Sequence, residues 1–307
     1  MREIRKINVK LPRISSPHPE PPAGISRKAE YLHACQLVWV LARREISAEY
    51  KGTVLGRLWS LINPLATIAV FAVIFGVIFR GGVEPGRNSG IDSFALWIGI
   101  GVLCWGYLSR VITNGMNTLV GNAGLLTKVY FPRWVLVLAS TVAQTFNFLF
   151  ELLVLLIVTM LMGGSKVLLY VPLLIPILLL SAAFGTGLAL LLSVGTVYYR
   201  DISHLWGIFT QIWMYASGVV FPLSMLVSAQ ETLAAKGFNW GGKPLPLDVI
   251  FRINPAELIL EANRAVFYDY AVAPPEVWLG ITIWAVLSLL AGILVFKKAS
   301  KRIVEEL

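Results

Sequence analysis

The segment from Leu37 to Phe79, LVWVLARREISAEYKGTVLGRLWSLINPLATIAVFAVIFGVIF, decides the fold of this chain. It begins as a basic amphipathic stretch and passes, through an Asn63-Pro64 pair, directly into an uncharged apolar run. A signal peptide would place a short apolar run near the N-terminus. Here the first long apolar run begins only at Leu58. The order therefore predicts a retained transmembrane helix with a cytoplasmic helix packed against its foot.

The composition predicts a polytopic membrane protein and excludes a soluble domain. Hydrophobic residues make up 57% of the 307 and charged residues only 14%. A helix that spans a membrane needs about 20 mostly apolar residues. We therefore expect an all-α fold with six transmembrane helices, of which the second continues past Arg110 to about Ile112. The six stretches are 58–79, 93–109, 134–162, 170–199, 205–227 and 277–296.

The distribution of basic residues orients these spans. With the N-terminus inside, 18 of the 26 Lys and Arg residues fall in inner segments and seven in outer ones, leaving Arg110 at a helix end. A positive excess marks cytoplasmic loops. Both termini are therefore expected on the cytoplasmic side of the membrane. The net charge of +9 is then explained by an anionic leaflet, and nucleic acid is not an expected partner.

The chain divides into three expected parts. Residues 1–28 form a basic, proline-rich, disordered arm, residues 29–57 an amphipathic interface helix, and residues 58–307 a transmembrane domain. At a helical spacing, five residues of the interface helix share an apolar face that Glu45 and Glu49 interrupt. These five are Tyr31, Cys35, Val38, Ala42 and Ile46.

The outer segment between the fifth and sixth spans, 228–276, is long. Within it Asn254, Pro255 and Glu257 have the pattern of an N-cap, an N1 proline and a reciprocal carboxylate. Apolar residues then recur at helical spacing. We expect an amphipathic helix at the outer surface.

The sequence holds no recognisable catalytic site, metal site or cofactor site. Gly237, Gly242 and Lys243 match part of a phosphate-binding loop, but Pro244 replaces the residue that would hold magnesium. A membrane-embedded glycosyl- or phosphotransferase would need a cluster of carboxylates or histidines at one depth, and none can be assembled. A transport subunit is therefore favoured over an enzyme.

Two charged residues lie near the hydrocarbon. Glu151 is placed 17 residues into the third span and Arg110 at the inner end of the second. Because these positions differ in depth, we expect no ion pair between them. A structural role and a role in the conduction path both remain open for Glu151.

Aromatic residues form two stripes. One is Phe71, Phe75 and Phe79 on the first span, and the other is Trp206, Phe209 and Trp213 on the fifth. Contact with lipid and packing between helices is one interpretation. The other is the wall of a path along which sugar rings stack.

Several short blocks resemble a known family. The blocks are Arg43-Arg44-Glu45, Tyr50-Lys51, Leu55-Gly56, Leu58-Trp59, Asn63-Pro64-Leu65, Val70-Phe71, Phe75-Gly76, 128–133 (KVYFPR), 199–202 (YRDI) and Asn254-Pro255. They resemble the membrane subunits of ABC exporters of lipid-linked polysaccharides, the Wzm, TagG/TarG and KpsM type. Glu49 departs from this family, in which a basic residue is common at that position.

The resemblance implies a homodimer of this subunit joined to two copies of a cytoplasmic ATPase, which binds ATP and magnesium. The cargo would be a polyprenyl-pyrophosphate-linked glycan: O-antigen, teichoic acid, galactan or capsule. A permease for a drug or small lipid is the alternative. The implied docking residues for the ATPase are Lys128, Tyr130, Arg133, Arg200 and Asp201. The implied site at which the lipid diphosphate enters comprises Arg43, Arg44, Lys51 and Arg57.

Overall fold

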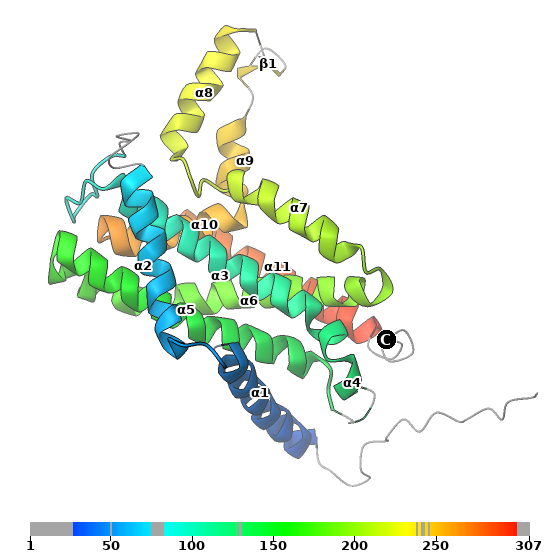
Figure 1. Cartoon of the computed structure of the whole chain (residues 1–307). Helices are drawn as coiled ribbons and strands as arrows, with labels where there is room; N and C mark the ends of the chain where they lie inside the picture. Colours follow the sequence, from blue (N-terminus) through cyan, green and yellow to red (C-terminus); the bar gives the residue numbers. More distant parts are fainter. Residues whose placement is uncertain are drawn as a thin grey trace, which may run out of the picture.

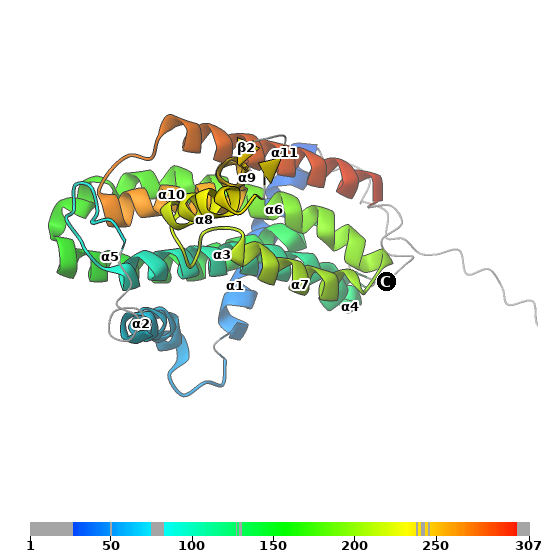
Figure 2. The same ribbon diagram turned by 90° about the horizontal axis from the view of Figure 1, so that it is seen from above.

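The computed structural model describes residues 27–49, 51–74, 83–126, 128, 131–237, 239–240, 243–244 and 246–299. Long helices form the body of the molecule (Figure 1). These are α3 (Phe94–Gly121), α5 (Trp134–Gly163), α6 (Leu174–Tyr198) and α11 (Pro275–Ala299). Helix α3 packs against α5 and α6, and α11 covers the far side of α6 (Figure 2). The expected third, fourth and sixth spans are confirmed as helices.

The second span is longer than the sequence indicated. Helix α3 starts after Ser93, whose hydroxyl oxygen accepts a hydrogen bond from the backbone amide of Leu96. The helix runs for 28 residues to Gly121. Its last turns continue beyond the apolar part because one side of them, with Gly115, Met116 and Leu119, is buried against the body. Asn117 donates to the carbonyl of Thr113 at 2.9 Å, and Thr118 to that of Asn114 at 2.7 Å. Arg110 is therefore inside a long helix, and its expected place at a helix end is wrong.

The first span lies on the near face of the body in Figure 1. A 3₁₀ turn, η1 (Gly56–Leu58), leads into α2 (Trp59–Phe71), which contacts α3 and α5. Pro64 lies within α2. The final part of the expected span, including Phe75 and Phe79, lies outside the described residues.

The expected fifth span is broken, so the prediction of six long spans is not met. Helix α7 (Ile202–Tyr215) has 14 residues and is about 21 Å long, short of the roughly 30 Å hydrocarbon core. The chain turns at Gly218, whose φ of +57° favours glycine, and Pro222 caps the next helix. Five helices in the described part of the chain are long and apolar enough to span, namely 56–74, 94–121, 134–163, 171–198 and 275–299.

An excursion from residue 220 to 253 follows this break and stands away from the body (Figure 1). It contains α8 (Leu223–Ala235), a short antiparallel hairpin and α9 (Leu247–Ile253). In the hairpin, β1 (Asn239–Trp240) pairs with β2 (Lys243–Pro244), a small exception to the all-α prediction.

Helix α10 (Pro255–Arg264) and the π-helix η5 (Ala265–Asp269) return into the body against α3 and α11. The N-cap prediction is confirmed, since Asn254 Oδ1 accepts the amide of Ala256 at 3.1 Å and Pro255 begins the helix. The prediction that the Glu257 carboxylate accepts a hydrogen bond from the backbone amide of Asn254 is wrong. The amide of Asn254 donates to the carbonyl of Phe251, and Glu257 Oε2 has no partner.

The expected interface helix is α1 (Arg27–Glu49), which crosses α5. Val38, Ala42 and Ile46 are buried there, as predicted, but Cys35 is exposed. At the far end of the body, α4 (Ala123–Leu126) lies near the tight turn between α6 and α7 (Figure 1). Two 3₁₀ turns, η3 (Ser165–Leu169) and η4 (Val171–Leu173), connect α5 to α6.

Helices α6 and α11 approach each other through glycines. A Cβ placed on Gly187 would lie 2.3 Å from the carbonyl carbon of Ser288, and one on Gly292 would lie 2.2 Å from the carbonyl oxygen of Gly187. Small residues at such crossings let membrane helices pack backbone to backbone.

We therefore expect Gly187→Ala to destabilise the protein, because the added methyl group meets backbone atoms that cannot rotate away. The cost should be about 1–3 kcal/mol, measured as a lower midpoint of thermal unfolding in detergent. Gly207→Ala in α7 is the matched control, since a Cβ there meets nothing within 4 Å. Equal midpoints for the two variants would contradict this account of the crossing.

Candidate functional site

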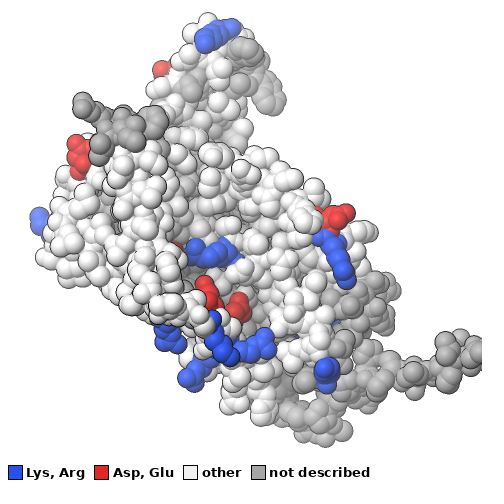
Figure 3. All heavy atoms as spheres, in the orientation of Figure 1, with Lys and Arg blue, Asp and Glu red and all other residues white. Residues whose placement is uncertain are grey.

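One face of the body is left uncovered by the part of the chain that the structure describes. Helices α2 and α7 flank it (Figures 1 and 2), and charged side chains of both signs gather near its centre amid largely uncharged surface (Figure 3). Large apolar side chains of α7 are exposed: Leu205, Ile208, Phe209, Ile212 and Tyr215. We call this side of the molecule the open face.

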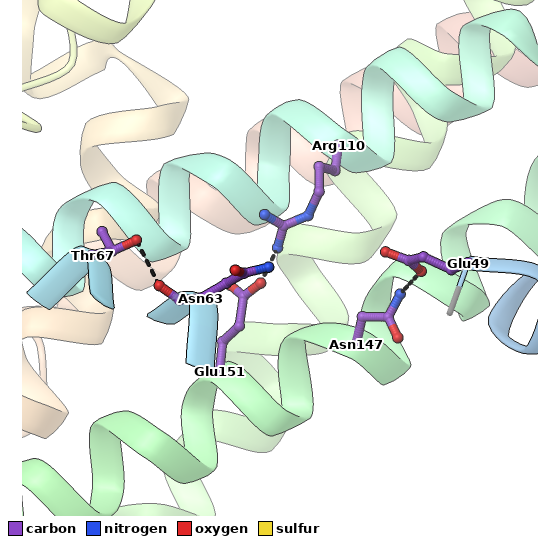
Figure 4. A network of polar contacts seen from close by, with 6 residues as sticks. All are labelled: Glu49, Asn63, Thr67, Arg110, Asn147 and Glu151. Carbon is purple, nitrogen blue, oxygen red and sulfur yellow. Dashed lines mark hydrogen bonds and ion pairs between the residues drawn. The ribbon is translucent and has the colours of Figure 1, made fainter. Parts of the chain in front are cut away.

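An ion pair lies on the open face. Arg110 Nη2 of α3 is 2.5 Å from Glu151 Oε1 of α5 (Figure 4), so the expectation that the two residues do not pair is wrong. Arg110 lies about 24 Å from the Phe94 end of α3, and Glu151 about 18 Å from the Gly163 end of α5. These two ends lie together, because Gly163 packs against Ile91. The remaining offset of about 6 Å is spanned by two long side chains.

The ion pair is only partly covered. The side chain of Arg110 is 37% exposed and that of Glu151 13%, and Glu151 Oε2 has no hydrogen-bond partner. A charge at this depth in a helix is costly unless it faces water or protein. The open face therefore meets an aqueous path or another polypeptide.

Further polar groups extend from the ion pair along α5. Ser140, Gln144, Asn147 and Glu151 are spaced by four, three and four residues, so they share one side of the helix. Asn63 and Thr67 of α2 lie beside the ion pair in Figure 4, where Thr67 donates to the carbonyl of Asn63 at 2.9 Å.

Helix α1 is bound to this polar stripe. Ser140 donates to Glu45 Oε1 at 2.9 Å, and Asn147 donates to Glu49 Oε2 (Figure 4). The two carboxylates that interrupt the apolar face of α1 are therefore its polar contacts with α5. Burial raises the pKa of Glu45 above its usual value, and the hydrogen bond from Ser140 opposes this shift.

This network was not predicted from the sequence, although one signal was present. The four polar residues of α5 repeat at helical spacing within an otherwise apolar span, and this pattern marks a helix side that does not face lipid. The stripe becomes visible only when Glu151 is considered together with Asn147, Gln144 and Ser140, which lie one, two and three turns before it.

The basic residues expected to meet a lipid diphosphate are exposed around the end of α1. Arg43, Arg44, Lys51 and Arg57 all have exposed side chains. Arg44 Nη2 donates to Asn122 Oδ1 at 2.9 Å, which connects α1 to the segment before α4. The structure brings these residues into one region of the chain, while their contact with a diphosphate stays a prediction.

The expected ATPase-docking residues lie at the end of the body that carries α4. Lys128, Arg200 and Asp201 are exposed, and Arg133 is half-buried before α5. Tyr130 lies outside the described residues. The turn of α6 into α7 and the end of α11 are at the same end (Figure 1).

The second aromatic stripe is built into the packing of α7. The ring of Trp213 meets that of Trp105 edge to face, with centroids 5.3 Å apart. It meets the ring of Phe184 in the same way, with centroids 6.3 Å apart. Trp206 Nε1 donates to Thr113 at 3.2 Å, whereas Phe209 is 49% exposed on the open face. Of the first stripe only Phe71 is described, and it packs against the core. A substrate path along these rings stays a prediction.

Both feet of the excursion are fastened to the body. Asn254 accepts a hydrogen bond from Trp213 Nε1 at 2.9 Å and donates to the carbonyl of Ala216 at 2.8 Å. Buried Arg264 donates to the carbonyls of Gly218 at 2.9 Å and Val219 at 3.2 Å. The excursion thus leaves and rejoins the body at one fixed point.

Metal-ligating side chains do not gather in the described ranges. No group of three or more His, Cys, Asp or Glu residues there is placed to hold a metal ion. The chemistry of the open face is that of hydrogen bonds, one ion pair and aromatic contacts.

Comparison with known proteins identifies the family. Residues 36–234 match the family model described as "ABC-2 type transporter". The chain is 26% identical over 267 residues to a protein of Myxococcus xanthus named O-antigen export system permease protein RfbA, covering 87% of this chain and 94% of that protein. Two Klebsiella pneumoniae proteins of the same name are 22% and 23% identical, covering 66% and 62% of this chain and 75% and 70% of theirs.

The matched region includes the ion pair, the polar stripe and the first part of the excursion, through most of α8. It covers well over half of the chain, which is a multi-pass membrane protein. The chain therefore belongs to the ABC-2 type transporters, as a membrane subunit that moves cargo and works with a partner ATPase.

Proposed function

We propose that this chain is the membrane subunit of an ATP-driven exporter of a polyprenyl-pyrophosphate-linked polysaccharide of the O-antigen class. The relatives named O-antigen export system permease protein support the assignment of an O-antigen cargo. The observation that carries the proposal is the polar open face, with an ion pair at membrane depth. Hydroxyl-rich cargo can exchange hydrogen bonds with such a face, whereas an apolar drug or small lipid gains nothing from it.

Two copies of the chain would place their open faces toward each other. A single open face cannot enclose a path, and its charges need shielding from lipid. The exposed apolar side chains of α7 and α2 at the edges would then form the contact between subunits. In this arrangement α7, with the segment after Gly218, serves as a sixth, broken crossing of the membrane.

The end that carries α4 would face the cytoplasm and receive one ATPase subunit for each permease, giving a two-plus-two complex. Exposed Lys128, Arg200 and Asp201 support this assignment, as does the positive excess of the inner segments. ATP and magnesium would bind to the ATPase. The excursion, at the opposite end, would act as the outer gate.

The cargo can be tested by complementation. Expressed with its ATPase in a strain that lacks its own O-antigen permease, the chain should restore glycan at the cell surface, whereas a partner with a disabled ATP site should not. Surface labelling of the glycan measures the outcome. Restoration of drug efflux without surface glycan would support the small-molecule alternative instead.

The open face can be tested by water accessibility. In a protein without Cys35 and Cys104, Asn63→Cys should react with a charged thiol reagent, because a thiolate forms only where water reaches it. Leu290→Cys on α11 is the control, since its exposed side chain faces away from the open face and should meet lipid. Reaction at position 290 but not at position 63 would overturn the assignment of the path.

The orientation can be tested on intact spheroplasts. Lys236→Cys should react with a membrane-impermeant maleimide from outside, and Lys128→Cys only after lysis, because basic loops remain in the cytoplasm. Both side chains are exposed, so in the permease expressed without its ATPase, access to the reagent depends on the side of the membrane alone. The reverse pattern would invert the topology and remove the outer gate.

A further inference from the structure

A groove of about 360 Å³ runs between α5 and α11, near the end of the body that carries α4. Because α6 packs against both of these helices, it lies between them and forms the floor. Figure 2 shows α11 and α2 on opposite sides of the body, so the α11 wall is remote from the open face. We call this feature the α5–α11 groove.

The lining of the α5–α11 groove is mostly apolar. Thr186 is the polar residue of its floor, and its hydroxyl already donates to the carbonyl of Ala182 at 2.7 Å. The apolar side chains are Trp134 and Leu138 of α5, Leu190 of α6, and Leu289, Ile293 and Phe296 of α11. Such a surface favours a hydrocarbon chain over water.

One end of the groove is positively charged. Lys297, in the last turn of α11, is exposed and lines the groove, whereas none of the described residues that line it is acidic. Trp134 lies at the same end, because it is the first residue of α5. Tryptophan is enriched where the hydrocarbon of a membrane meets the headgroups. The groove thus joins an apolar slot to a basic, interfacial end.

The length of the groove agrees with the depth of one leaflet. From Lys297 to Leu289, α11 rises about 12 Å. Half of the hydrocarbon core is about 15 Å thick. An acyl chain that enters beside Lys297 therefore fills the groove within its own leaflet.

A second apolar groove, near the other end of α11, has a different charge. Its volume is about 690 Å³, and its charged lining residues are Arg252, Glu261 and Glu276. One positive and two negative groups do not attract an anion. Selection for an anionic lipid is therefore expected at the α5–α11 groove and not at this one.

We propose that the α5–α11 groove binds one anionic phospholipid of the inner leaflet, with an acyl chain between the helices and the phosphate beside Lys297. Basic residues at the cytoplasmic side of membrane helices attract anionic headgroups. The bound chain adds contact between two helices that both pack on α6. The proposal is independent of the cargo, and only the choice of leaflet rests on the proposed orientation.

Native mass spectrometry of the permease in complex with its ATPase tests this site. The complex, in detergent, is mixed with equal amounts of phosphatidylglycerol and phosphatidylcholine that have the same acyl chains. One phosphatidylglycerol per permease chain should be retained at a detergent concentration that removes phosphatidylcholine, because the headgroup is the one difference between the lipids. Equal retention of both lipids would overturn the proposal and leave the groove to unselected lipid.

Lys297→Gln tests the headgroup contact. It should lower the retention of phosphatidylglycerol roughly fivefold, which is the effect expected of one lysine near an anionic headgroup. Lys298→Gln is the matched control, because it removes the same charge from an exposed neighbour that does not line the groove. An equal loss in the two variants would show attraction to a positive surface in general and would overturn the site.

Ile293→Trp tests the position of the acyl chain. Ile293 lines the groove and is 38% exposed, so a larger ring there should fill the groove and displace the lipid. Leu294→Trp, 66% exposed and outside the lining, should retain it. Retention in both variants would contradict an acyl chain between α5 and α11. The lysine variants leave the apolar packing unchanged, so they test the proposal even where the tryptophan lowers stability.

Discussion

The cost of an exposed charge within a membrane determines how the rest of this molecule is arranged. Arg110 and Glu151 neutralise each other, but both remain partly uncovered, and lipid is a poor neighbour for either. The face that carries them must be shielded by water or protein. The flanking helices α2 and α7 are accordingly the least covered by the chain itself, whereas α3 and α6 are packed on several sides.

The long helices and their order could be predicted from the sequence, because hydrophobic length is a strong local signal. The family was also predictable, since blocks such as Leu58-Trp59 and Asn63-Pro64 lie in short, conspicuous motifs, and the family match confirms it. Helix ends were harder. The packing of Gly115, Met116 and Leu119 against the body extends α3 beyond its apolar part, and no hydropathy pattern records that contact.

The candidate site was less predictable because its contacts join residues far apart in the sequence. The pairing of Arg110 with Glu151 depends on the relative depth of two helices, and an error of nine residues in the end of α3 was enough to hide it. The break after α7 had a local cause in Gly218, but a positive φ is set by the surrounding structure. Likewise, buried Arg264 of α10 stacks on Trp97 of α3, and no local sequence pattern connects these two residues.

The attachment of α1 to α5 has a mechanical consequence. Glu49 holds Asn147, and Glu151 follows Asn147 by one turn of the same rigid helix. Arg44 adds a second attachment, to Asn122 at the end of α3, the helix that carries Arg110. Helix α1 is thus hydrogen-bonded to both helices that carry the ion pair. A displacement of α1 therefore acts on α3 and α5 together and changes the position of Arg110 relative to Glu151. This coupling does not pass through the excursion.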